Sequence, residues 1–474
     1  MFIRITPFLF CLLFTFNVSA VGQSASETTL ASVRRSDAAS RDANGNLQRL
    51  PVAEHMRRAA IYLSVRAFEE ARDHWRAVLK YYSEDPGNPR VAEAMLGIGR
   101  SYFLGKDYED GYTVFNAVVQ KYDSTKEGRE ELNFSAASLL RMGRFDESAA
   151  RYIEYVEKFP AGERIDTAHL NVIDTLREAG RPKEALTWVT RTRQRFAGTA
   201  VETNAIFAAL RLHISEGNWN DAIRTAEELS KRSFSRAVDT SRSEVAYLTA
   251  FSLEQAGRKD EAFNAYMAIG DGIESYYGWL ATNRLTALAG RGERAALVAQ
   301  RESAVKSAVA AVADSYPAPY RQSILTAAKS RKLDPRFILA LIKQESVFKP
   351  MAKSPAGARG LLQLTMDAAV KYGPSAGYRS VSEIQLYQPE TSITLGAEYL
   401  EHLADMFPKM LEPIAASYNG GEDNVARWLK RSRYNDPGVF TAEVGFDETK
   451  GYVQKVMSNY RVYRELYTSD LIRR

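Results

Sequence analysis

An internal repeat between residues 53 and 284 constrains the fold of this chain more than any other feature. The unit reads as a helix, a tight turn and a second helix that opens with acidic residues before a small one. Successive turns are 38, 37, 37 and 40 residues apart, at Gly105, Gly143, Gly180, Gly217 and Gly257. Because one helix pair cannot bury its apolar face alone, such units stack on their neighbours. We therefore predict an α-solenoid.

A period slightly above 34 residues with this turn chemistry resembles the tetratricopeptide repeat (TPR). We expect a TPR-like superhelix over residues 51–290, with a degenerate first copy at residues 65–68. Its concave surface is a candidate binding site for an envelope protein partner. The alternative is that the repeats serve as a spacer and a platform for the C-terminal part of the chain.

The first residues are typical of a secretory signal peptide. Arg4 precedes an apolar run over residues 8–14, and small residues at 18–20 suit a cleavage site. We predict a signal peptide over residues 1–20, export to the periplasm and no transmembrane segment in the mature chain, because the run is too short to span a bilayer. Cys11 is the only cysteine, so the mature chain would have no disulfide and no thiolate metal site.

Two segments are expected to connect the larger parts of the chain. Residues 21–50 are rich in small and polar residues with few large apolar ones, which predicts a mobile leader that buries little surface. Residues 291–316 read as a helical linker, and Pro317 and Pro319 mark the start of a C-terminal domain over residues 317–474.

The charge of the chain is too close to balance to indicate nucleic-acid binding. The formal net charge is +5 over 474 residues. The basic excess lies in the last third of the chain. It suits an anionic polymer substrate, and an ordinary solvated surface explains it equally well.

Glu345 is the residue on which we expect the chemistry to depend. Ile338, Leu341 and Ile342 recur at helical spacing, and Glu345 falls on the same face. Apolar surroundings disfavour the charged carboxylate and raise its pKa, so the acid could donate a proton near neutral pH. The alternative is a half-exposed glutamate paired with a neighbouring lysine, Lys343 or Lys349.

Four blocks in this order and spacing resemble the catalytic domain of soluble lytic transglycosylases (SLT), a lysozyme-like fold that cleaves the glycan strands of peptidoglycan. The blocks are the Glu-Ser pair at 345–346, Gly-Leu-Leu-Gln at 360–363, Ser-Tyr-Asn-Gly-Gly at 417–421 and Glu-Thr-Lys-Gly-Tyr-Val at 448–453. The resemblance covers residues 317–474. The aromatic segment at 275–281 also resembles the junction between the superhelix and the catalytic domain of this family.

The resemblance implies a mechanism with one carboxyl group. Glu345 would protonate the scissile oxygen of the β-1,4 bond between MurNAc and GlcNAc. It would then deprotonate the 6-hydroxyl of the sugar, which closes on C1 to give a 1,6-anhydromuramoyl product. No metal and no cofactor would be needed. The residues implied to bind substrate or to hydrogen-bond the acid are Ser354, Gln363, Tyr418, Asn419 and Glu448.

The chain departs from the family pattern at a few of these positions. Leu362 stands for a Met, Thr365 stands where the family often has Met, and Ser417 stands for an Ala. None of these changes removes a titrating group, so they affect the expected sugar contacts and not the acid.

Two other functions stay open. A goose-type lysozyme-like hydrolase would need a second carboxylate near Glu345, with Asp367, Glu383 and Glu390 as candidates. A catalytically inactive envelope scaffold would need only the repeats.

The predicted fold class is mainly all-α, with an N-terminal TPR-like α-solenoid followed by a lysozyme-like domain. In that domain we expect helices over residues 320–331, 335–348, 360–372, 392–407, 411–418, 421–431 and 449–467.

Overall fold

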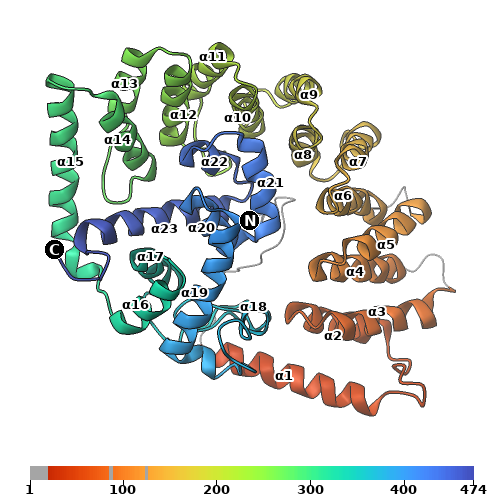
Figure 1. Cartoon of the computed structure of the whole chain (residues 1–474). Helices are drawn as coiled ribbons and strands as arrows, with labels where there is room; N and C mark the ends of the chain where they lie inside the picture. The colour runs from red at the N-terminus through yellow and green to blue at the C-terminus, as the bar shows by residue number, and fades with distance from the viewer. Residues whose placement is uncertain (1–19, 85–88, 123–125) are drawn as a thin grey trace. The chain divides into compact units, whose positions relative to one another are not determined.

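The computed structural model describes residues 20–84, 89–122 and 126–474 (Figure 1). Over these residues the regular structure is helical, and β pairing is limited to isolated bridges. This confirms the mainly all-α class. The predicted signal peptide lies outside the described residues, apart from Ala20. The described residues pack as two compact units, one that ends at Phe196 and one that runs from Ala197 to Arg474. The functional domain bounds stay predictions.

The unit that ends at Phe196 consists of one long helix followed by four helical hairpins. The helices are α1 (Ala20–Ala39), α2 (Val52–Ser64), α3 (Phe68–Tyr82), α4 (Pro89–Gly105), α5 (Tyr108–Lys121), α6 (Lys126–Arg141), α7 (Phe145–Lys158), α8 (Ile165–Glu178) and α9 (Pro182–Arg195).

In each of the repeated turns, one residue adopts a positive φ. Gly143 and Gly180 adopt φ of 76° and 70°, a region that glycine enters without steric penalty. At the turn marked by Gly105 it is Lys106 that takes this conformation, with φ 71°. Elsewhere glycine allows close approach: a Cβ on Gly99 would lie 2.3 Å from the Phe115 ring.

Residues 21–50 contribute a few buried side chains to the first unit. They include α1, in which Val33 is buried. Asp37 is buried too, and its carboxylate pairs with Arg58 and accepts a 2.6 Å hydrogen bond from the Tyr62 hydroxyl. That the segment is a mobile leader stays a prediction. The buried carboxylate of Asp37, with its partners on α2, attaches α1 to α2 although the segment has few large apolar residues.

The second unit contains further repeat helices and the C-terminal helices. The first group is α10 (Ala200–Ser215), α11 (Trp219–Ser230), α12 (Arg242–Gln255), α13 (Lys259–Met267), α14 (Tyr276–Leu288) and α15 (Glu293–Ala311). The second group is α16 (Arg321–Ser330), α17 (Pro335–Ser346), α18 (Met366–Tyr372), α19 (Pro389–Met406), α20 (Leu411–Gly420), α21 (Glu422–Ser432), α22 (Pro437–Glu443) and α23 (Asp447–Leu466).

One expected helix is shorter than predicted, and one helix was not predicted. The helix expected from residue 360 begins at Met366, because Gly360 and Gln363 have positive φ of 79° and 47°, which a right-handed helix does not contain. A bridge between Arg359 and Leu364 closes this loop instead. The additional helix, α22, is capped by Asp436, whose carboxylate accepts from the amide of Val439.

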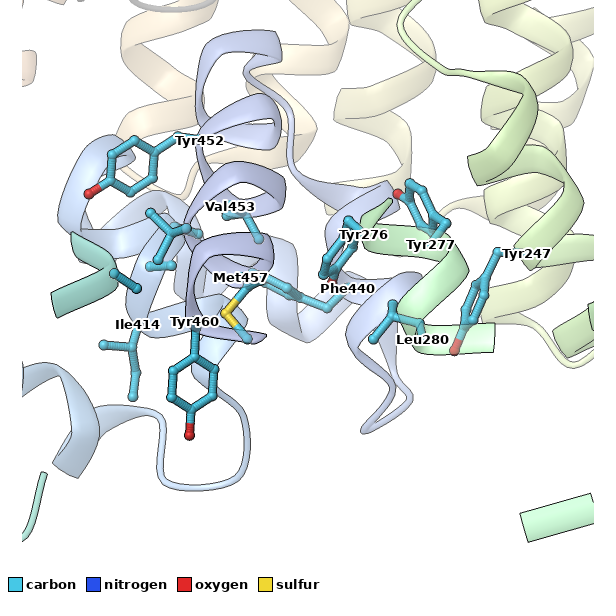
Figure 2. Packing of buried hydrophobic residues seen from close by; sticks show 14 of the residues in the cluster. Tyr247, Tyr276, Tyr277, Leu280, Ile414, Phe440, Tyr452, Val453, Met457 and Tyr460 are labelled. Atoms are coloured by element: carbon cyan, nitrogen blue, oxygen red, sulfur yellow. The ribbon is translucent and has the colours of Figure 1, made fainter. Parts of the chain in front are cut away.

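A single hydrophobic core joins the repeat helices of this unit to its C-terminal helices. Figure 2 shows Tyr276 and Leu280 of α14 near Phe440 of α22, while Tyr452, Val453, Met457 and Tyr460 follow one another along α23. Helix α23 packs against α17 and α20 as well as α14 and α15. It therefore touches both halves of the unit. No helix of the described chain is long and apolar enough to cross a membrane.

Candidate active site

Glu345 lies in the last turn of α17, a helix whose start and face follow from its sequence. Asp334 caps it by accepting the amide of Arg336 at 2.9 Å, and Pro335 occupies the first helical position. The helix ends at Ser346, where Val347 and Phe348 adopt φ of 50° and 60°. This left-handed turn ends the helix directly beyond Glu345.

Glu345 is half-buried, and among the described residues its carboxyl is hydrogen-bonded to Tyr452. The Tyr452 hydroxyl donates to Oε1 at 2.5 Å. Burial raises the pKa of Glu345 to about 7, and the hydrogen bond from Tyr452 opposes part of that rise, because it stabilises the charged form. A substantial fraction of the molecules therefore carry a protonated Glu345 near neutral pH.

The alternative of a lysine-paired glutamate does not fit the contacts. Lys343 donates to the carbonyl oxygen of Ser315 at 2.8 Å and lies over the ring of Tyr316. No ion pair joins Glu345 to Lys343 or Lys349 in the part of the chain that the structure describes.

Three tyrosines gather beside the acid. Tyr418 from α20 donates to the carbonyl oxygen of Leu362 at 2.7 Å, and its ring lies 5.2 Å from that of Tyr399 on α19. Burial, with the neighbouring Glu345, raises the pKa of Tyr418 well above its usual value. Burial and Glu345 do the same to Tyr452. These hydroxyls therefore stay protonated and act as hydrogen-bond donors near Glu345.

Gln363 and Ser354 hold the loop between α17 and α18. Gln363 adopts φ 47°, and its amide nitrogen donates to the carbonyl oxygens of Ala352 and Gly360 at 3.1 and 2.8 Å. The Ser354 hydroxyl accepts the amide of Ala358 at 3.0 Å. Within the described residues, no hydrogen bond links either side chain to Glu345. Both serve the fold of the loop here, and their contact with substrate stays a prediction.

Asn419 and Glu448 occupy the junction of α20 with α23. The Asn419 carboxamide oxygen accepts the hydroxyl of Thr449 at 2.6 Å, which ties the two helices together. Glu448 is exposed in the first turn of α23; partial burial raises its pKa, while Lys455 opposes the rise. Its place in the first turn suits the helix dipole as well as a substrate.

The structure thus brings Tyr418 beside Glu345 and leaves Ser354, Gln363, Asn419 and Glu448 engaged elsewhere or facing solvent. Sequence reasoning did not single out Tyr452 or Thr449. The signal was available for Tyr452, because it lies four residues after Glu448 and therefore near it on the same helix.

The carboxylates that a hydrolase would need lie in other environments. Glu383 pairs with Arg359 at 2.8 Å, and Asp367 and Glu390 are exposed in the first turns of α18 and α19. The pKa of Glu345 is set by burial and by Tyr452, with no carboxylate of the described chain contributing.

No metal centre accompanies the acid among the residues described. No group of three or more His, Cys, Asp or Glu side chains there is arranged to hold a metal ion.

Two family models match the chain. Residues 322–438 match the transglycosylase SLT domain, and residues 56–124 and 136–198 match the tetratricopeptide repeat. The chain therefore combines tetratricopeptide repeats with an SLT domain, which confirms the combination expected from sequence.

Curated relatives and a solved structure agree with this combination. A soluble lytic murein transglycosylase of Escherichia coli is 32% identical over 161 residues, which are 33% of this chain and 24% of the relative. One of Salmonella typhimurium is 32% identical over 155 residues, 32% of this chain and 24% of the relative. The chain thus spans 24% of the length of either relative. A 70-kDa soluble lytic transglycosylase, solved in complex with bulgecin A, has a TM-score of 0.50 and 15% identity over 94% of this chain and 90% of that chain, a likeness of fold alone.

Proposed function

We propose that this protein is a lytic transglycosylase that cleaves the MurNAc–GlcNAc β-1,4 bond of peptidoglycan and leaves 1,6-anhydromuramoyl ends. The observation that carries the proposal is the state of Glu345. Its pKa of about 7 suits a group that must first give up a proton and then take one back. The similarity of residues 322–438 to SLT domains supplies the substrate class.

The contacts assign separate tasks to the two carboxyl oxygens. Because Tyr452 donates to Oε1, the acid proton belongs on Oε2. That proton passes to the glycosidic oxygen as the bond from C1 to the leaving sugar breaks. The resulting carboxylate, stabilised by the Tyr452 donor, then takes the proton of the 6-hydroxyl. The 6-oxygen bonds to C1, which closes the anhydro ring and restores the acid.

A goose-type hydrolase is the second candidate, and the surroundings of Glu345 support it less. Hydrolysis would require a carboxylate that activates or replaces water on the far face of the sugar. Among the described residues, the candidates Asp367, Glu383 and Glu390 take no part in setting the charge of Glu345.

Digestion of purified sacculi followed by mass spectrometry of the fragments tests the proposal. The expected products carry anhydro ends, lighter by one water than reducing ends. Reducing ends would indicate the hydrolase, and undigested sacculi would indicate an inactive scaffold. Glu345→Gln, which preserves shape, serves as the matched control and should leave the sacculi intact.

Export and partners follow from the same proposal. A peptidoglycan substrate requires delivery to the periplasm, for which the signal-like residues 1–20 are suited. The TPR region is proposed to bind an envelope protein or to act as a spacer. Fractionation of cells expressing the tagged full chain tests the location, since recovery in the cytoplasm alone would contradict it.

A further inference from the structure

The first two turns of α23 join Glu345 to the repeat helices through two side chains, Lys450 and Tyr452. Tyr452 donates to Glu345 on α17. The Lys450 ammonium donates to Glu244 Oε1 on α12 at 3.2 Å, and to the carbonyl oxygen of Asp239 in the loop before α12 at 2.9 Å. Residues two apart on a helix point about 200° away from each other. The start of α23 is therefore held by Lys450 on one side of the helix, and Tyr452 points from the opposite side toward Glu345.

The carboxylate that accepts Lys450 is held by contacts within the start of α12. Ser241 caps this helix and accepts the amide of Glu244 at 3.2 Å. The second carboxylate oxygen of Glu244 accepts the Thr240 hydroxyl at 2.9 Å, so a contact other than Lys450 also orients the carboxylate. The ammonium also lies 5.0 Å from the centre of the Phe207 ring.

The Lys450–Glu244 pair is buried, and its burial favours a role in positioning the helices over a role in stability. The side chains of Lys450 and Glu244 are 9% and 1% exposed. Two charges removed from water lose hydration that their attraction barely restores, so a buried ion pair is weak evidence for added stability. What such a pair does well is to specify one arrangement, because a displaced lysine would leave an unpaired charge in the interior.

We propose that the buried Lys450–Glu244 pair is a positioning device, by which the repeat helix α12 holds the first turn of α23 where Tyr452 reaches the carboxyl of Glu345. This inference rests on the proposed function for its activity readout and adds residues that act through Tyr452. Thr449, the residue before Lys450, ties the same turn to Asn419 of α20. The hydrogen bonds of Lys450 go to Glu244 and Asp239, and neither Lys450 nor Glu244 is hydrogen-bonded to Glu345 among the described residues.

The test uses the full chain with both charges removed together, Lys450→Met with Glu244→Gln, because loss of the lysine alone would strand a buried carboxylate. Displacing Tyr452 weakens its hydrogen bond to the Glu345 carboxylate. We expect the high-pH limb of kcat/KM on solubilised glycan strands to move up by about 0.5–1 pH unit. We also expect kcat to fall by up to about tenfold, with KM unchanged, because positioning and not sugar binding is altered.

A matched control lies on the same helix. Arg461 pairs with Asp271 at 2.6 Å and is similarly buried, but it lies nine residues beyond Tyr452. Arg461→Met with Asp271→Asn should lower thermal stability and leave the pH limb in place. An equal shift in this control, or no shift in the Lys450 and Glu244 variant, would overturn the proposal.

A second background separates positioning from general loosening. In a Tyr452→Phe chain the hydrogen bond is already absent, so the Lys450 and Glu244 substitutions should shift the limb no further. An additional shift of the same size would show that the pair acts by another route.

A readout without activity distinguishes the two proposals. The melting temperature of each variant against pH, relative to the same variant carrying Glu345→Gln, reports the titration of Glu345 directly. A shifted titration in a protein that does not cleave glycan would sustain the positioning device and reject the proposed function. Cleavage with an unshifted titration would do the reverse.

Discussion

Glu345 carries two opposed influences at the scale of a single residue. Burial favours its neutral form, while the hydroxyl of Tyr452 favours the carboxylate, and the balance leaves its pKa at about 7. An acid held too strongly neutral could give a proton only with difficulty, and one fully ionised would have none to give. Lys343, the nearest rival partner in sequence, is engaged by Ser315 and Tyr316.

Glu345→Gln should abolish glycan cleavage and change stability in a pH-dependent way. The folded pKa of about 7 exceeds the ordinary value of 4.5, so stability from the neutral carboxyl is complete below about pH 4.5 and is lost as the pH rises to about 7. Glutamine avoids this loss. Thermal melts should show the variant more stable than the wild type at pH 8, by about 1–3 kcal/mol, with little difference near pH 4. An unchanged difference across this range would contradict the raised pKa.

Tyr452→Phe should raise the pKa of Glu345, because it removes the donor that stabilises the carboxylate. The high-pH limb of kcat/KM should therefore move upward, and kcat should fall roughly tenfold since the second half of the reaction loses its donor. Tyr460→Phe is a matched control on α23: its hydroxyl donates to Asp334 at 2.8 Å, away from the acid. A limb shift in both variants would point to helix movement instead.

At the scale of elements, the loop before α18 is decided by backbone conformation. Gly360 and Gln363 have positive φ, and the Gln363 amide closes the loop on Ala352. The loop also supplies the Leu362 carbonyl that accepts Tyr418. Thr365, where the family often has Met, caps α18 by accepting the amide of Ala368 at 3.2 Å. The departure from the family pattern thus has a structural role.

Gly360→Ala should distort this loop and reduce activity with it. The new Cβ would meet the Leu386 carbonyl at 2.0 Å, in addition to the strain of φ 79°. We expect a loss of about 2–4 kcal/mol in unfolding free energy from the two effects together.

Gly357→Ala provides the comparison for that prediction. It has a similar φ of 81°, but its Cβ would come no nearer than 3.8 Å to the Arg359 guanidinium. Strain alone should then cost about 1 kcal/mol, measured by urea unfolding. Equal losses in the two variants would show that the contact with Leu386 has no effect.

At the scale of the whole molecule, charges buried between the repeat helices and the C-terminal helices of the second unit make the two interdependent. Asp436 pairs with Arg284 at 2.8 Å and accepts the Tyr247 hydroxyl at 2.9 Å. The Arg461–Asp271 and Lys450–Glu244 pairs cross the same boundary. In each pair one partner precedes residue 317. The compact unit that contains these pairs begins at Ala197, well before the predicted domain boundary at residue 317.

A fragment of residues 197–474 should therefore fold cooperatively, while a fragment of residues 317–474 should not reach comparable stability. The shorter fragment leaves Asp436, Lys450 and Arg461 without their partners, and an unpaired buried charge costs about 3–5 kcal/mol. Circular dichroism melts of both fragments measure the difference. Equal melting temperatures would show that these pairs contribute nothing to the C-terminal helices.

The sequence by itself determined the helical class and the repeat, and it singled out Glu345 as the candidate acid. These follow from local patterns: the spacing of glycine turns, the apolar face that ends in Glu345 and the blocks around it. Such signals depend on residues a few positions apart.

Tertiary structure decided the rest, because the deciding contacts join residues distant in the chain. The Leu386 carbonyl leaves no room for a side chain at Gly360, and Asp37 finds partners on α2. Tyr452 meets Glu345 across 107 positions, and Lys450 meets Glu244 across 206. No local pattern encodes such pairings, since each forms only once the helices have packed.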